Sequence, residues 1–412
     1  MKSIQCLKRL AMSLMLLCGM ALMAMAEQRN YVVSGVVKDR QTMRVLSQVN
    51  VSIPESNIST VTNDDGYFLL KSSSRPDRIL VSLIGYKSRY VSIDEEHPTD
   101  MTILMSANNI MLNEIFVLPD NPYDILSQAL HRVNDNYGRQ QRLMQTFYRE
   151  TAQKHSRYIY VAEAVGEMLK TGYNHGIQRD WVSIVKGRSL VSPRPSDTLG
   201  VKIQGGPVLA LRLDVVKNQD IIFNAEELQH YKFSMLDPEK IDDRLQNVIG
   251  MEPGMLAEHA LFYGKFYVDN EDFTITRVEL SLDMSNRDKA TDMMLIKKPA
   301  GLRFKPKELS VVLTYQRSGG YSHLQYVSTK MRFNCDWKRR LLSSPFTVVT
   351  EMVVTDQIME VHGKPGQGVF SNRDSFFDKV ELFDDKDFWK DYNIIEPSES
   401  LEQGINKIRK LH

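Results

Sequence analysis

The nine histidines of this 412-residue chain are the first candidates for catalysis or metal binding. A zinc peptidase needs two histidines and a glutamate at the spacing HExxH, together with a third ligand. No two histidines here lie three to five residues apart, and HExxH does not occur. The serine-hydrolase elbow GxSxG, the P-loop and the dinucleotide motif GxGxxG are absent as well. The sequence therefore predicts no catalytic residue, no cofactor site and no metal ligand.

An acidic turn in TNDDGYFLL, residues 62–70, is a second candidate, because carboxylate and amide oxygens are the ligands that calcium prefers. A calcium loop also needs oxygen ligands at alternate positions and a distal glutamate, which this stretch lacks. Asn63 and its acidic neighbours can instead bond their own backbone, and Gly66 accepts the left-handed conformation of a tight turn. We expect a turn without calcium, and a half-buried ring rather than a catalytic phenol at Tyr86.

Two further features could contact a ligand or do chemistry. Backbone could approach a ligand closely at Gly205 and Gly206, in KIQGGPVLALRLD, residues 202–214. An ordinary turn before an apolar strand explains the same pattern, and both interpretations stay open. Cys335, in RFNCDWK, would need a basic partner to act as a nucleophile, so we expect a half-buried strand residue.

The first 26 residues have the order of a secretory signal peptide: a basic start, an apolar run over residues 10–23, and Ala-Met-Ala at residues 24–26. The alternative, lipoprotein processing at Cys18, needs a small residue before the cysteine, where Leu17 stands. We expect an exported protein, periplasmic or associated with the outer membrane. Cleavage would leave Cys335 as the one cysteine, so no internal disulfide could form.

The charge of the chain argues against a nucleic-acid partner, and its hydropathy argues against a membrane-spanning segment. Removal of residues 1–26 takes away three basic residues and no acidic one, so the net charge falls from +1 to −2. That balance gives no electrostatic basis for binding nucleic acid. No later stretch has eighteen uncharged apolar residues, so we expect no transmembrane segment in the mature chain.

The elements expected after the signal peptide are mainly strands. Short runs of β-branched residues between Tyr31 and Ser106, bounded by Asn, Asp, Gly, Ser or Pro, predict a small antiparallel β-sandwich. Residues 108–122 form a linker with a short strand, EIFVL, and a helix begins near Asn121 and ends near Gly138. The predicted domains are residues 1–26 (signal peptide), 27–107 (sandwich), 108–122 (linker) and 123–412 (a larger α+β domain).

The larger domain is predicted to hold a long-stranded antiparallel sheet. A hairpin is expected over residues 145–173, although Ala, Glu and Met in its second half also favour helix. A meander of long strands is expected over residues 261–357, with the two glycines of RSGGYS in one of its turns. Residues 172–260 contain the breakers RPSD, QGGP and EPG and are expected to be irregular. The tail from about Ser375 is expected to be helical, with Ser398 as a cap.

The first module resembles the carboxypeptidase regulatory-like domain common in envelope proteins of Bacteroidetes. Three stretches carry the resemblance: SGVVKDRQTMRVLSQVNVSI, STVTNDDGYFLL and ILVSLIGYKSRYVSI. The residues that match the family pattern are Gly35, Val37, Asp39, Thr62, Asp65, Gly66, Phe68, Ser82, Gly85 and Tyr86. Asn50 departs from it, where a small residue is usual. The resemblance implies a seven-stranded, transthyretin-like sandwich without catalytic residues.

The remaining chain is similar, more loosely, to periplasmic lipoprotein carriers, which are curved half-barrels that shelter acyl chains. The order of a helix, a hairpin and a long-stranded meander carries this resemblance, so it informs the fold more than the function. It implies that Phe262, Phe266 and Val268 face the concave side of the sheet. An ordinary protein core explains the same residues.

The function predicted from these observations is a non-enzymatic envelope protein, a binding or carrier module whose partner is a lipid, a glycan or an outer-membrane protein. One alternative is a hydrolase whose site is dispersed over residues 172–260. Another is a scaffold without a ligand, in which the C-terminal helix fills the concave face.

Overall fold

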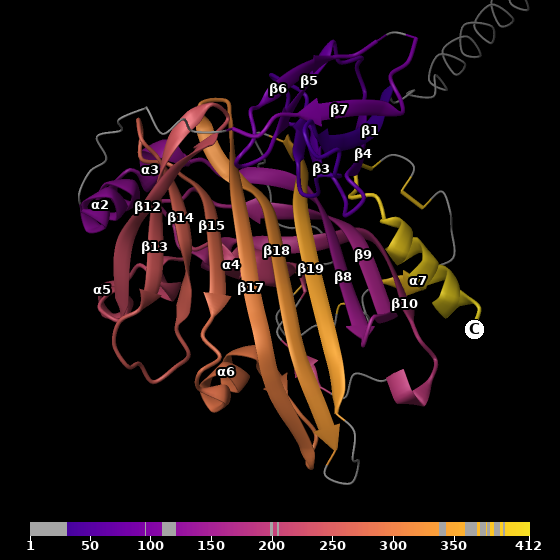
Figure 1. Ribbon diagram of the computed structural model, residues 1–412, viewed down its shortest axis with the longest axis vertical. Coiled ribbons are helices and arrows are strands. Elements are labelled where there is room, and N and C mark those ends of the chain that lie inside the picture. Colours follow the sequence, from indigo (N-terminus) through magenta and orange to yellow (C-terminus); the bar gives the residue numbers. More distant parts are fainter. Residues whose placement is uncertain are drawn as a thin grey trace, which may run out of the picture.

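A computed structural model describes residues 31–94, 96–108, 121–197, 201–203, 206–337, 343–358, 369–370, 376, 380–382, 388–389 and 392–412. They form a small sandwich, which packs against one side of a large, curved sheet (Figure 1). The predicted signal peptide and the EIFVL strand lie outside the described residues. No helix in the described part of the chain is long and apolar enough to cross a membrane.

The N-terminal sandwich has the seven strands that the sequence predicts. Its two sheets have the orders β4-β1-β7 and β3-β2-β5-β6, and their facing sides bury apolar residues such as Val37, Val51 and Phe68. The strands are not all antiparallel as expected, because β1 and β7 pair in parallel. The bounds are β1 Tyr31–Asp39, β2 Asn50–Ser52, β3 Ser59–Val61, β4 Tyr67–Ser72, β5 Arg78–Ser82, β6 Arg89–Ser92 and β7 Met101–Met105.

The predicted helix after the linker is present, as α2 (Pro122–His131) and α3 (Val133–Asn136). Asn121 caps α2, with its side chain accepting the backbone N–H of Tyr123 at 3.0 Å. Gly138 follows α3 with a φ of 83°, a conformation that glycine adopts at no steric cost.

The large sheet contains 12 strands among the described residues and does not close into a barrel, so a curved, half-barrel-like sheet results (Figure 1). Its order is β12-β13-β14-β15-β17-β18-β19-β8-β9-β10-β20, with β21 pairing in parallel to β10 and every other pair antiparallel. The bounds are β8 Arg142–Lys154, β9 Arg157–Lys170, β10 Trp181–Val191, β12 Tyr231–Ile241, β13 Arg244–Pro253, β14 Phe262–Asp269, β15 Ile275–Leu282, β17 Leu302–Ser318, β18 Tyr321–Trp337, β19 Ser344–Ile358, β20 Val369–Phe370 and β21 Glu381–Leu382.

Residues 172–260 are less irregular than predicted, because β10, β12 and β13 all lie within them. Pro238 lies within β12, which is an edge strand, where the missing N–H of proline removes no ladder bond. The pairing of β12 with β13 shifts between Leu236 and Glu239, so a bulge accommodates the proline.

Short helices connect these strands. The expected apolar strand after Gly206 is instead the helix α4, Pro207–Leu213, since proline fits the first turn of a helix. The other short elements are the 3₁₀ turns η1 Ile177–Arg179, η2 Pro195–Asp197 and η3 Gln219–Ile221, the helices α5 Ala225–Leu228 and α6 Arg287–Met294, and the strand pair β11 Lys202–Ile203 and β16 Leu295–Lys297.

The C-terminal helix is shorter than predicted. It begins after Ser398, which caps it as expected, and α7 spans Glu399–Arg409. No helix lies in the described residues between 376 and 398. Leu401, Ile405 and Ile408 of α7 pack against Val161 of β9 and Leu190 of β10.

Candidate functional site

The two faces of the large sheet are covered by different parts of the chain. The inner face packs against α4, η3 and residues 222–223, and the outer face packs against the sandwich, residues 388–389 and 392–395, and α7. On β9, Ala162 and Ala164 belong to the inner core, whereas Val161 and Val165 belong to the outer clusters. The C-terminal helix therefore does not fill the concave side, so that part of the scaffold alternative is wrong.

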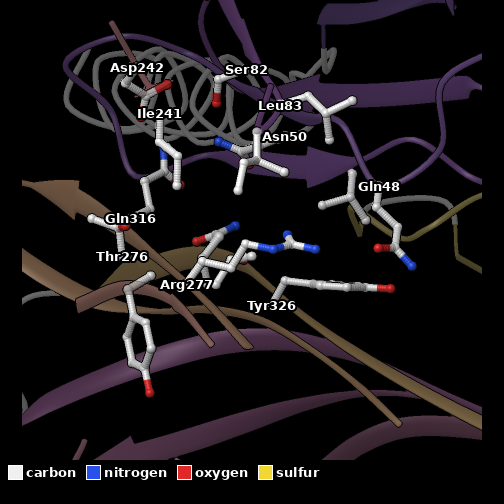
Figure 2. A pocket seen from close by; sticks show the side chains of 15 residues that line it. Gln48, Asn50, Ser82, Leu83, Ile241, Asp242, Thr276, Arg277, Gln316 and Tyr326 are labelled. Atoms are coloured by element: carbon white, nitrogen blue, oxygen red, sulfur yellow. The ribbon is translucent and has the colours of Figure 1, made fainter. Parts of the chain in front are cut away.

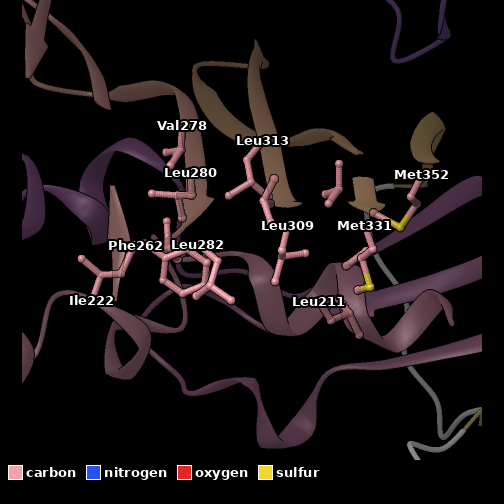
Figure 3. Packing of buried hydrophobic residues seen from close by; sticks show 14 of the residues in the cluster. Leu211, Ile222, Phe262, Val278, Leu280, Leu282, Leu309, Leu313, Met331 and Met352 are labelled. Atoms are coloured by element: carbon pink, nitrogen blue, oxygen red, sulfur yellow. The ribbon is translucent and has the colours of Figure 1, made fainter. Parts of the chain in front are cut away.

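The inner face is a continuous apolar surface. Figure 3 shows side chains of β15, β17, β18 and β19 in a row above Leu211 of α4. Leucine and methionine dominate this row, and methionine is the apolar side chain that adapts most easily to a change in its surroundings. The row contains Val278, Leu280, Leu282, Leu309, Leu313, Met331 and Met352, all at most 8% exposed.

The apolar residues predicted to face a ligand lie in this inner core. Phe262 is 7% exposed, and Phe266 and Val268 are fully buried. The ring of Phe266 lies 5.1 Å from that of Phe223, which follows η3. Protein side chains cover all three here, and that they contact a ligand stays a prediction.

Of the predicted glycine pair, Gly205 lies outside the described residues, and Gly206 begins α4. Gly206 has a φ of 84°, and its N–H donates to the hydroxyl of Tyr148 at 3.0 Å. Tyr148 in turn donates to Glu150 at 2.8 Å, on the same face of β8. Burial raises the pKa of Glu150, and these hydrogen bonds oppose the rise. Gly206 thus anchors the start of α4 to the sheet.

A buried cluster of charged and phenolic groups holds the other end of α4. Asp214 is fully buried and accepts hydrogen bonds from Lys170, from Tyr173 at 2.9 Å and from Tyr315 at 2.7 Å. Burial alone would raise the pKa of Asp214, but the ammonium of Lys170 and the two hydroxyls bring it below its usual value.

Lys217 extends the cluster. Its ammonium contacts both carboxylate oxygens of Asp180 at 2.7 Å and the carbonyl of Thr171 at 2.6 Å. Burial, followed by the charge of Lys170, lowers the pKa of Lys217 to about 8. Asp180, Asp214 and Lys217 belong to residues 172–260, where the hydrolase alternative placed its site. Because their charged groups are paired and buried, the cluster acts as it stands to fasten α4 and η3 to β9.

Sequence reasoning missed this cluster, because its members come together only in the fold. Asp214 and Tyr315 are 101 residues apart. Within the described part of the chain, no group of three or more His, Cys, Asp or Glu side chains is arranged to hold a metal ion.

The outer face carries a second buried ion network. Glu163 is fully buried and accepts from Arg149 at 2.8 Å and from Arg188 at 2.9 Å. Burial would raise the pKa of Glu163, but the two guanidinium groups lower it. Arg149 also donates to the carbonyl of Ile395 at 2.6 Å, so the network joins the sheet to the C-terminal segment.

The acidic turn of the sandwich joins the same segment. The side chain of Asn63 accepts the N–H groups of Asp65 and Tyr67, each at 3.0 Å, and Gly66 has a φ of 71°, as a tight turn requires. A carboxylate oxygen of Asp65 accepts the N–H of Glu399 at 2.6 Å. The turn was predicted correctly, and the structure adds that it caps the first turn of α7.

A small polar cavity of about 70 Å³ lies between the sandwich and the sheet. Figure 2 shows the guanidinium of Arg277 between Asn50 above and the ring of Tyr326 below. Arg277 donates to Glu279 at 2.7 Å, and the side-chain oxygen of Asn50 finds no partner among the described residues. A cavity of this size has room for a few water molecules, which would satisfy such groups.

The two remaining candidates are not positioned as reactive groups. Cys335 is a buried residue of β18, and burial raises the pKa of its thiol to about 12, so the thiol stays protonated at neutral pH. The ring of Tyr86 is partly buried, and burial together with Asp39 raises the pKa of its hydroxyl. The partial burial of Tyr86 is as expected, whereas Cys335 lies in a strand as expected but is more deeply buried than predicted.

Residues 33–117 match the family model of the CarboxypepD_reg-like domain. The N-terminal sandwich is a CarboxypepD_reg-like domain. The match extends past the predicted boundary at residue 107 into residues that the structure does not describe. It covers the smaller part of the chain, so the large sheet stands outside it. No match was found among curated proteins.

Two solved structures are similar to part of the chain, at low scores. A DUF1329 family protein from Desulfovibrio piger is 9% identical, with a TM-score of 0.25 over 60% of this chain and 96% of that one. A LolA superfamily protein from Nitrosomonas europaea is 15% identical, with a TM-score of 0.21 over 58% of this chain and 94% of that one. At these scores the likeness supports no conclusion about what this chain binds.

Proposed function

We propose that this protein is a non-enzymatic carrier or binding module of the cell envelope, which holds an apolar ligand of the acyl-chain class against its inner face. The observation that carries the proposal is the continuous apolar inner face, covered by short helices instead of a second sheet. α4 has seven residues and α5 has four. Helices this short have little stability of their own, so packing on the sheet must hold them in place.

The acyl chain would take the place of this cover. Leu211 and Phe223 contact the leucines and methionines of the sheet without directional bonds, and an acyl chain makes the same kind of contact. The polar anchors stand at the two ends of α4, at Gly206 and Asp214. They would let the cover return to one position after the ligand leaves.

The first test is native mass spectrometry of the protein after gentle extraction from its own envelope. We expect a bound mass that organic extraction removes. The extracted protein should then bind a fluorescent fatty acid. Recovery of bare protein alone, together with no binding of the fatty acid, would contradict the proposal.

A pair of variants locates the site. Met331→Trp adds bulk to the inner face at a residue that is 2% exposed, and we expect fatty-acid affinity to fall about tenfold or more. Arg332→Trp, at the next residue, adds the same ring where the side chain is 58% exposed, and it should bind as the parent does. Circular dichroism confirms that both variants fold. An equal loss of fatty-acid affinity in both variants would place the ligand away from the inner face.

A further inference from the structure

Three large apolar side chains are unusually exposed at one end of the inner face. Leu256 is 95% exposed and Met255 is 56% exposed, side by side in the connection between β13 and β14. Ile296, which follows α6, is 50% exposed. Single exposed apolar residues are ordinary in soluble proteins, but neighbouring ones mark contact surfaces.

The two connections that carry these residues are joined. The ammonium of Lys289 in α6 donates to the carbonyl of Ala257, next to Leu256. Figure 1 shows α6 beside the long connection between β13 and β14, at the end of the sheet opposite the sandwich. We call Met255, Leu256, Ile296, Lys297 and Lys298 the apolar rim.

The exposure of Leu256 is built into the fold. The N–H groups of Gly254 and Met255 both donate to the carbonyl of His230, at 2.7 and 3.2 Å, so the residue that precedes β12 holds the start of the connection. Its end is held as well, because Asp283 donates to the carbonyl of Leu261 at 2.8 Å. Between these anchors the backbone turns Leu256 toward solvent.

Basic residues outnumber acidic ones on the connection that carries Ile296. Residues 287–303 contain five basic and two acidic side chains. Lys297 and Lys298 are exposed, directly after Ile296, and the described residues offer them no ion pair. Glu252, at the end of β13, and Glu258, on the neighbouring connection, are exposed, so the positive charge of this surface comes from the side of Ile296. A surface that pairs exposed leucine, methionine and isoleucine with lysine fits the boundary between anionic headgroups and acyl chains.

We propose that the apolar rim docks this protein onto an anionic lipid surface. The rim leads directly into the inner face, because Leu261 of the first connection and Met294 of α6 are both buried in the inner core. Docking would therefore bring that end of the inner face to the membrane. This inference extends the proposed carrier function, but the docking itself needs no ligand in the inner face.

The test is flotation of the full chain with vesicles of phosphatidylcholine containing phosphatidylglycerol, compared with phosphatidylcholine alone. We expect binding that is stronger with phosphatidylglycerol and weaker at high salt. The double variant Met255→Asp and Leu256→Asp should lower the partition coefficient about tenfold or more, since it removes two inserting side chains. Lys297→Gln with Lys298→Gln should remove most of the preference for phosphatidylglycerol.

Two controls make the result specific. Tyr90→Ser removes a side chain that is 59% exposed on the sandwich, and it should float as the parent does. Met331→Trp should also float normally, so failure of the carrier proposal is distinguishable from failure of docking. No flotation of the parent, or equal flotation of the Met255 and Leu256 variant, would overturn the inference. Capture of a protein through these residues without vesicle binding would assign the rim to that protein instead and overturn it as well.

Discussion

The inner and outer faces of the large sheet are both buried, yet different forces hold what covers them. The outer face is fixed by directional bonds: Arg149 and Arg188 enclose Glu163, and Ser59 of the sandwich donates to the carbonyl of Val354 at 3.0 Å. The cover of the inner face lies mainly on leucine and methionine, with polar anchors at the ends of α4 and at Lys217, before η3. This difference indicates that the outer face suits a permanently attached cover, whereas the inner face suits a cover that a ligand can displace.

Removal of one outer-face cation should produce the largest effect. In Arg149→Ala, the buried carboxylate of Glu163 keeps one guanidinium instead of two. Breaking a buried ion network in this way costs about 3–5 kcal/mol, measured as the loss in free energy of unfolding in urea. The matched control is Arg139→Ala. Arg139 pairs with Asp135, and these side chains are 66% and 71% exposed, so the variant should change the free energy of unfolding by less than about 1 kcal/mol. Similar effects in both would show that the outer network is not rigid.

A cavity created in the inner face should lower the free energy of unfolding somewhat less than the loss of Arg149. Leu313 is fully buried, and Leu313→Ala should lower the free energy of unfolding by about 2–4 kcal/mol, through lost apolar burial and a residual cavity. If the inner face adapts as proposed, a bound fatty acid should fill part of this cavity and restore part of the stability. The control is Val185→Ala, at a residue that is 50% exposed. A cavity that fatty acid does not stabilise would contradict the exchangeable cover.

Acid should destabilise the sheet through His323. Burial, followed by the charges of Arg142 and Lys170, lowers the pKa of His323 from 6.5 to about 3. Below pH 6.5 the unfolded chain therefore takes up a proton that the folded chain refuses. Stability should fall with decreasing pH between about 6.5 and 3, by at most about 1.4 kcal/mol per pH unit from this residue.

The His323→Leu variant isolates that contribution. The difference in unfolding free energy between parent and variant should change with pH across this window and stay constant above pH 7. Urea unfolding at a series of pH values measures it. If the difference in unfolding free energy between parent and variant is the same at every pH, water must reach His323 from one of the two faces of the large sheet.

The smallest effect is expected at the acidic turn. Asp65→Ala removes the acceptor for the first N–H of α7 and should lower stability by about 1 kcal/mol. Replacement of Asp64 and Asp65 by Asn should leave the response of the melting temperature to calcium and to chelator unchanged. A melting temperature that falls on chelation in the parent alone would show instead that the turn binds calcium.

Sequence reasoning predicted the parts of the fold that local patterns encode. Alternating apolar strands, the cap at Asn121 and the turn at Gly66 all depend on neighbours within a few residues. The strand β12 was missed because the breakers RPSD, QGGP and EPG favoured an irregular segment over residues 172–260. α4 was missed because PVLALRL satisfies the patterns of both strand and helix.

The candidate site was predictable only in its apolar part. Phe262 and Phe266 stand out through their alternation in one strand, and they do lie in the inner core. Asp214 could not be recognised, because Lys170 and Tyr173 reach it from one distant segment and Tyr315 reaches it from another. The exposure of Leu256 is a property of the folded connection, since its local sequence looks like any apolar pair.

The contact between the acidic turn and the last helix has a consequence for the order of folding. Asn63 donates to the carbonyl of Pro397, 334 residues further along the chain, at 3.1 Å. Closing so long a loop is slow, whereas the sandwich can form from neighbouring strands alone. This contact can therefore form only after Pro397 has been made, whereas the strands of the sandwich all lie within residues 31–105.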